Sequence, residues 1–137
     1  MVRGRANGSY WGVVLDAPDP AHLAAFYASV LGWTVHSGDE NFVTVAPPDG
    51  VAYLAVQRQI DPAFVRPTWP ASGSAQQMMM HLDIEVSSLD EAIADALSLG
   101  ATLAPFQPQE HCKVLLDPVG HPFCLYVDTS ITEAPEA

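Results

Sequence analysis

Apolar positions along the first half of the chain follow two different periods, which together predict strands around one helix. Residues 12–16 form a short β-branched run that a proline-rich turn then closes. In residues 21–31 apolar side chains recur at spacings of three and four, the period of one buried helical face, and Gly32 is placed to end this helix as a left-handed cap. Three further apolar segments, each bounded by turn residues, predict strands at 33–36, 41–46 and 51–57. The first half therefore has the order βαβββ.

The same order of elements begins again after residue 80. A strand at 81–86 is followed by a helix at 89–99, whose apolar residues lie on one face, and by Gly100. The first strand begins 20 residues before the capping glycine in the first half and 19 residues before it in the second. Turn signals at 47–50 and 117–120 precede the last strand of each half. A repeat of this kind indicates a duplicated unit.

These patterns predict an α+β fold made of two βαβββ modules in a single domain, which suits a chain of 137 residues. Module one covers about residues 10–58 and module two about residues 78–128. The crossover between them, residues 59–77, contains prolines and large aromatic residues and is expected to be ordered. The turn at 117–120 is expected to be structural, with Gly120 at positive φ.

Composition and charge narrow the classes of protein that the chain can represent. Apolar residues make up 49% of the sequence, yet no stretch approaches the roughly 20 apolar residues that span a bilayer. The net charge of −11 would repel both nucleic acid and an anionic membrane surface. Residues 1–8 lack the apolar run of a secretory signal, and the two cysteines are expected to be free thiols in a reducing compartment. We expect a cytoplasmic protein that binds neither nucleic acid nor membranes.

Four segments together carry a resemblance to a known family. They are Asp16 to Tyr27 with Leu31, Gly32 and Trp33; Trp69 with Pro70; His81 to Val86; and Asp117 to Tyr126. In order and spacing they are similar to the glyoxalase-like branch of the vicinal oxygen chelate superfamily, and the resemblance covers roughly residues 10–128. It implies the glyoxalase/bleomycin resistance/dihydroxybiphenyl dioxygenase-like fold and a possible homodimer. This fold hosts isomerases, dioxygenases, epimerases and drug-sequestering proteins, so function has to be argued from the site.

Metal-dependent members of the superfamily imply four ligands from four strands, typically His, Glu or Gln. The corresponding positions here are Gly12, Leu54, His81 and Cys124. Glycine and leucine side chains cannot bind a metal ion, and two donors fall short of the three protein ligands of a catalytic zinc site. Gln57 replaces Leu54 only if the strand register shifts by an odd number of residues. We therefore expect no catalytic metal in the family position and no cofactor, with a divalent metal ion as the alternative.

The resemblance implies a sheet that curves around a cavity and carries its helix on the other face. Strand alternation then directs His81, Asp83 and Glu85 into the cavity, where the two carboxylates either bind a cationic or polyhydroxylated ligand or pair with an arginine of the crossover. The residues expected to contact a ligand, from the cavity faces of the strands and from the crossover, are Asp16, His81, Asp83, Glu85, Cys124, Tyr126 and Trp69.

Each of these residues also has an ordinary structural interpretation. His81 is either a general base or a histidine hydrogen-bonded to a neighbouring strand. Cys124 is more often an inert buried thiol than a reactive one, and large aromatic residues are more often core than ligand contacts. His111 and Cys112 are adjacent on one predicted strand and face opposite ways, which makes them a poor pair for a metal ion.

Two hypotheses about function follow. The first is a glyoxalase-like protein whose internal cavity binds a small organic molecule without the catalytic metal of the family. The second is an enzyme, of the lyase, isomerase or dioxygenase type, in which His81 acts as the catalytic base and Asp83 or Glu85 orients it. A solvent-reachable imidazole in a pocket favours the second hypothesis, and a histidine buried against the backbone favours the first.

Overall fold

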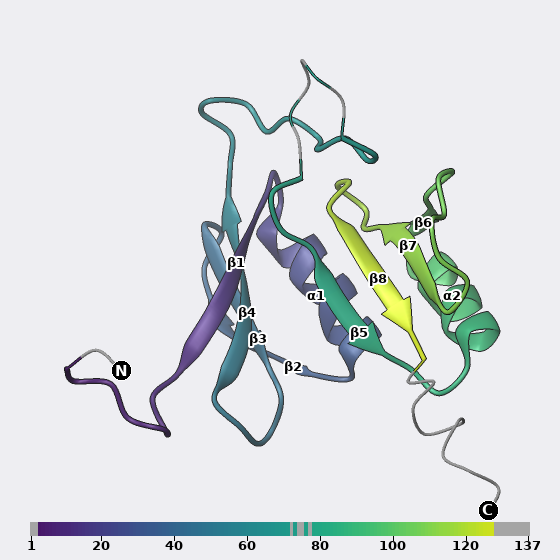
Figure 1. The fold of residues 1–137 in the computed structure, drawn as a ribbon. Coiled ribbons are helices and arrows are strands. Elements are labelled where there is room, and N and C mark those ends of the chain that lie inside the picture. The colour runs from purple at the N-terminus through teal and green to yellow at the C-terminus, as the bar shows by residue number, and fades with distance from the viewer. Residues whose placement is uncertain (1–2, 72, 74–75, 77, 128–137) are drawn as a thin grey trace, which may run out of the picture. The chain divides into compact units, whose positions relative to one another are not determined.

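The computed structural model describes residues 3–71, 73, 76 and 78–127. The chain forms two compact units, Met1–Phe64 and Val65–Ala137, so the boundary lies inside the predicted crossover. In the described residues each unit contains one helix and four strands, in the order βαβββ that the sequence predicts (Figure 1). No helix in the described ranges is long and apolar enough to cross a lipid bilayer.

The first unit contains one mixed four-stranded sheet with the strand order β1-β4-β3-β2. Its elements are β1 Trp11–Ala17, α1 Pro20–Leu31, β2 Thr34–Gly38, β3 Phe42–Ala46 and β4 Ala52–Arg58. β1 runs parallel to β4, and the remaining neighbours are antiparallel. The start of α1 follows from the local sequence, because the Asp19 carboxylate accepts a hydrogen bond from the backbone N–H of His22 (3.4 Å) and Pro20 occupies the first turn. Gly32 ends the helix at φ 70°, as predicted.

The core of the first unit lies between α1 and one face of the sheet. α1 packs mainly against β3 and β4. The buried side chains of this layer alternate along the strands and recur along the helix, and they are Leu23, Phe26, Tyr27, Val43, Val45, Leu54 and Val56. The alternation leaves the residues between them on the other face, which is not covered by α1. We call that face the open face of the sheet.

The second unit repeats this architecture with the strand order β5-β8-β7-β6. Its elements are β5 Leu82–Glu85, α2 Leu89–Ser98, β6 Thr102–Leu103, β7 Cys112–Leu116 and β8 Pro122–Tyr126. Ser88 caps α2 by accepting a hydrogen bond from the backbone N–H of Glu91, and the helix ends one residue earlier than predicted, with Leu99 as its C-cap. β5 runs parallel to β8. Trp11 pairs with Ala52 and Leu82 pairs with Phe123, a separation of 41 residues in both units, as expected for a duplicated unit.

The turn between β7 and β8 depends on a buried carboxylate. Asp117 is fully buried, and its Oδ1 accepts hydrogen bonds from the backbone N–H groups of Val119 and His121, both at 2.9 Å. Gly120 has φ 100°, and a Cβ at this position would collide with the side chain of Arg66. The structural role predicted for this segment is confirmed.

We expect Asp117→Ala to lower the free energy of unfolding by about 2–4 kcal/mol, because two buried backbone donors lose a charged acceptor. Asp117→Asn keeps an acceptor oxygen at the same position and should lose less. Urea denaturation of the two variants and the parent protein measures both differences. A loss below about 1 kcal/mol for Asp117→Ala would show that the turn does not depend on this carboxylate.

Candidate functional site

The open face of the second sheet brings together most of the residues that the sequence singles out in this unit. The parallel register places Asp83 beside Cys124 and Glu85 beside Tyr126, and paired residues point to the same face. Their neighbours in the strands, Leu82, Ile84, Phe123 and Leu125, point to the side of α2. The predicted alternation of β5 and β8 therefore describes the two faces correctly.

His81 and Asp83 form a polar pair at the exposed edge of this face. His81 lies directly before β5, and its Nε2 is 3.1 Å from Oδ1 of Asp83. The two side chains are 41% and 62% exposed, so the imidazole is reachable from solvent. Arginine partners were the other expectation for Asp83 and Glu85, but Arg58 pairs with Glu40 and Arg66 donates to the carbonyl of Pro118. The His81 contact holds the carboxylate beside the imidazole and restricts how both can turn.

Cys124 lies at the centre of a small apolar cluster on the same face. The cluster consists of the buried residues Ala104, Val114 and Cys124, with Trp69, Cys112 and Leu116 packed against it. Burial raises the pKa of the Cys124 thiol from 9.0 to about 12, with smaller contributions in the same direction from the Cys112 thiol and the Asp83 carboxylate. Both cysteines are free thiols, as expected, and Cys124 is buried, with 7% of its surface exposed. At neutral pH the Cys124 sulfur is therefore protonated and a poor nucleophile.

Three potential metal ligands converge at this point. One donor atom each from His81, Asp83 and Cys124 lie within 4.8 Å of one another. The sequence analysis counted His81 and Cys124 as the only donors of the second half, because it compared this chain with a pattern that has no ligand at Asp83. It also dismissed Cys112 on account of its neighbour His111, although the strand pairing brings Cys112 close to Cys124.

The first unit does not provide the other half of a four-strand metal site. Gly12 pairs with Tyr53, and a Cβ at Gly12 would collide with the Tyr53 ring, so a ring covers the position where a ligand would begin. Leu54 was assigned to the cavity side, and this was wrong: Leu54 is buried in the core on the α1 side. Gln57 does lie on the open face without any shift of register, but it donates a hydrogen bond to Asp16 (2.7 Å). The residues present therefore do not fit the four-strand metal set.

The other expected ligand contacts occupy different places. Trp69 packs against the Cys124 cluster, and its Nε1 donates a long hydrogen bond of 3.5 Å to the carbonyl of Phe106. Tyr126 is half-buried at the end of β8, beside Glu85 and Cys112. Asp16 lies on the open face of the first sheet, bonded to Gln57. The second unit therefore gathers His81, Asp83, Cys124 and Trp69 around one cluster, with Glu85 and Tyr126 further along the same strands.

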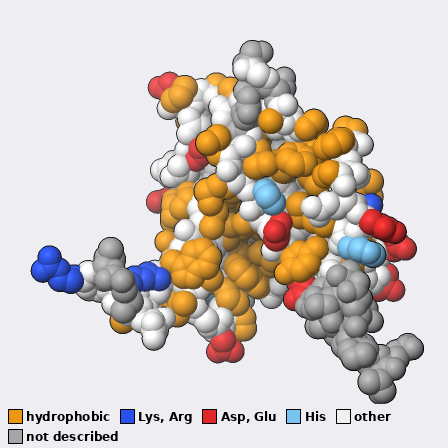
Figure 2. Space-filling view, viewed as in Figure 1, with side chains coloured by type: hydrophobic (Ala, Val, Ile, Leu, Met, Phe, Trp, Pro, Cys, Tyr) orange, Lys and Arg blue, Asp and Glu red, His pale blue; other side chains and the backbone are white. Residues whose placement is uncertain are grey.

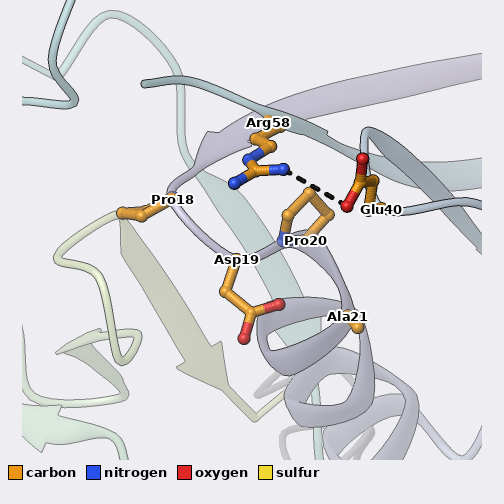
Figure 3. A pocket seen from close by; sticks show the side chains of 6 residues that line it. All are labelled: Pro18, Asp19, Pro20, Ala21, Glu40 and Arg58. Carbon is orange, nitrogen blue, oxygen red and sulfur yellow. Dashed lines mark ion pairs between the residues drawn. The ribbon is translucent and has the colours of Figure 1, made fainter.

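A surface pocket of about 370 Å³ lies at the start of α1 in the first unit. Figure 3 shows Arg58 and Glu40 directed toward one another above Pro20, and their charged groups are 3.6 Å apart. Because Glu40 is 79% exposed, this ion pair contributes little to stability. The pocket contains none of the residues that the sequence predicts for a site, and no sequence signal pointed to it.

Apolar side chains are also exposed around the polar groups. Figure 2 shows them over much of one face of the molecule, with acidic and histidine side chains set singly among them. In the second unit the exposed large apolar residues are Val65, Met79, Met80, Leu97, Leu99, Leu103 and Phe106. Exposed apolar surface with a few polar groups is typical of surfaces that bind small molecules or other proteins.

The raised pKa of Cys124 predicts a specific loss of stability at high pH. The unfolded chain releases this thiol proton near pH 9, whereas the folded protein keeps it up to about pH 12. The free energy of unfolding should therefore fall as pH rises through this range, by at most about 1.4 kcal/mol per pH unit for one proton. Urea denaturation of reduced, metal-free protein at several pH values measures this slope, and Cys124→Ala should remove this contribution.

Cys112→Ala is the matched control for that measurement. It removes a neighbouring thiol but leaves the burial of Cys124, the largest cause of the shift, and so should keep most of the slope. Parallel curves for Cys124→Ala and the parent protein would contradict the raised pKa.

Comparison with solved structures identifies the architecture. A glyoxalase/bleomycin resistance protein/dioxygenase family enzyme from Burkholderia phytofirmans PsJN is 22% identical, with a TM-score of 0.61 over 89% of this chain and 98% of that chain. A glyoxalase/bleomycin resistance protein from Albidiferax ferrireducens T118 is 16% identical, with a TM-score of 0.60 over 87% and 98%. The fosfomycin resistance protein FosX from Listeria monocytogenes, solved with Mn(II) and sulfate, is 13% identical, with a TM-score of 0.61 over 93% and 91%. At these identities the similarity establishes the fold.

Sequence comparison establishes the family. The search of curated proteins gives no match for this chain. The family model described as the glyoxalase-like domain matches residues 12–126, which include both βαβββ units and all the candidate site residues. The resemblance inferred from the sequence is confirmed, and the chain belongs to the glyoxalase-like domain family of the vicinal oxygen chelate superfamily.

Proposed function

We propose that this glyoxalase-like protein binds a small organic molecule on the open face of its second sheet, without the four-strand metal site of its superfamily. The observation that supports this proposal is the exposed pair of His81 and Asp83 beside the apolar cluster of Cys124. Ligand sites in proteins typically combine an apolar surface with a few polar groups that fix orientation.

The apolar part of the proposed site has a defined composition. Val114 and Cys124 form its floor, and Trp69 packs against them from the crossover. The ring of Trp69 supplies a large, rigid surface against which an aromatic or aliphatic group can pack.

The polar part gives the proposed site its selectivity. The Asp83 carboxylate accepts hydrogen bonds only, and the His81 imidazole can donate one and accept another. A ligand that carries both an apolar group and a hydroxyl or amine group therefore matches the two parts together. Glu85 and Tyr126, further along the strands, extend the polar part for a longer ligand.

A metal of the four-strand kind is not part of this proposal. FosX was solved with Mn(II), and Mn²⁺ prefers carboxylate, carbonyl and water oxygens. In this chain a tyrosine ring covers the first-unit position at Gly12, and the second unit offers a thiol at Cys124. These residues do not match a ligand set for that ion.

A catalytic role for His81 is the second candidate function, and one observation favours it. The imidazole is solvent-reachable, and its Nε2 faces Oδ1 of Asp83 at 3.1 Å. A carboxylate in this position orients an imidazole and raises its basicity, as in a general base that removes a proton beside a carbonyl group. The activity would be that of a lyase or an isomerase.

Ligand binding can be tested on protein freed of metal by EDTA. We expect some members of a panel of aromatic amines, diols and hydroxyketones to raise the melting temperature, since a compound at 100 times its Kd stabilises the folded state by about 2.7 kcal/mol. Calorimetric titration of each such compound should show weaker binding to His81→Ala and to Asp83→Asn, by about tenfold for the loss of one hydrogen bond to a charged group. Asp49→Asn, an exposed carboxylate of the first unit, is the control and should bind as the parent protein does. A panel without any stabilising compound, or unchanged binding in both site variants, would refute the proposal.

The catalytic candidate has a separate test. Compounds with an acidic C–H beside a carbonyl are incubated with the protein in D₂O, and exchange of that hydrogen is followed by NMR. A general base predicts exchange that His81→Ala slows by about a hundredfold or more. Exchange that is equal in His81→Ala and the parent protein would exclude His81 as the base.

A further inference from the structure

We propose that the second unit by itself holds one divalent cation of the zinc class, bound by an imidazole nitrogen of His81, a carboxylate oxygen of Asp83 and the sulfur of Cys124. All three residues belong to β5, to β8 or to the residue directly before β5. The proposal goes beyond the proposed function and does not rest on it, because the organic ligand is tested on metal-free protein.

The positions of the three donors support such a site. Their donor atoms lie within 4.8 Å of one another, and the Nε2 to Oδ1 distance from His81 to Asp83 is 3.1 Å. Zinc bonds of about 2.0–2.3 Å in tetrahedral geometry place donors about 3.4–3.8 Å apart. The donors therefore need to move by only about 1 Å to fit. The exposed side chains of His81 and Asp83 allow this movement without any change in the core.

Strand pairing keeps the donors together. Asp83 is paired directly with Cys124 in the parallel ladder, so their side chains leave the same face at adjacent positions. Cys124 is buried on that face, whereas His81 and Asp83 stand at its exposed edge. A cation would therefore have one fixed donor below it and two mobile donors open to solvent. Three protein ligands with one position left open is the arrangement of catalytic rather than structural zinc sites.

The donor types determine the class of ion. A combination of sulfur, imidazole nitrogen and one carboxylate suits zinc and similar thiophilic ions, whereas Mn²⁺ and Mg²⁺ prefer oxygen. The Cys112 thiol lies beside Cys124, so the surroundings of the site contain a second sulfur. On binding, the Cys124 sulfur forms a bond to the ion and its proton passes to solvent. This site differs from a four-strand metal set, which would require donors from the first unit.

The proposal can be tested with Co²⁺ as a spectroscopic substitute for zinc. Reduced full-length protein is freed of metal with EDTA, dialysed, and titrated with CoCl₂ while its absorbance is recorded. We expect one equivalent of Co²⁺ to bind with a near-ultraviolet band from sulfur-to-cobalt charge transfer, and ZnCl₂ to displace it. Cys124→Ala should lose the band, and Asp83→Asn and His81→Ala should weaken Co²⁺ binding at least about tenfold. Zn²⁺ should bind more tightly than Mn²⁺ in the parent protein.

Two control variants keep the donor types but not the positions. His111→Ala removes a histidine next to Cys112, and Asp90→Asn removes an exposed carboxylate of α2; both should bind Co²⁺ as the parent protein does. Circular dichroism checks that each variant is folded, and if Cys124→Ala is not, the exposed variants Asp83→Asn and His81→Ala decide the outcome. The proposal is wrong if no stoichiometric binding occurs, if a folded Cys124→Ala keeps the band, if Asp83→Asn and His81→Ala bind normally, or if Mn²⁺ binds more tightly than Zn²⁺.

Discussion

The parallel pairing between the first and last strands of each unit is the constraint on which the rest of the structure depends. Paired residues of a parallel ladder point to the same side, so this pairing puts Gly12 with Tyr53 and Asp83 with Cys124. It also directs the intervening apolar residues toward the helix, where they form the core of each unit. A shift by one residue would exchange the buried and the open side chains, and burial of the apolar set prevents that shift.

The two units use this shared backbone in different ways. In the first, the ring of Tyr53 covers Gly12, and the polar groups of Asp16 and Gln57 are bonded to each other. In the second, the corresponding open face carries an exposed histidine and carboxylate beside a buried thiol. Membership of the glyoxalase-like family explains the backbone, whereas the side chains on the open faces have to be interpreted for this chain alone.

Much of the fold could be predicted from the sequence, because burial against a helix imposes one period on strands and another on helices. The face of β4 could not, since residues 52–56 are apolar without alternation, and Leu54 was therefore placed on the wrong side. The proximity of Cys112 to Cys124 was also missed. It depends on the register of the β7–β8 hairpin, which the predicted turn at 117–120 determines, so it could have been worked out from the sequence. The contact between His81 and Asp83 depends on rotamers, about which residue spacing carries no information.

The equal separation of 41 residues between paired strands also bears on how the chain folds during synthesis. The ladder of the first sheet uses no residue beyond Arg58, so its hydrogen bonds can form while β5 is still to be translated. The second sheet cannot close until β8, the last strand described, has left the ribosome. Two short closures made in succession, in place of one pairing across the whole chain, keep the contact order of the protein low and favour rapid folding of each unit.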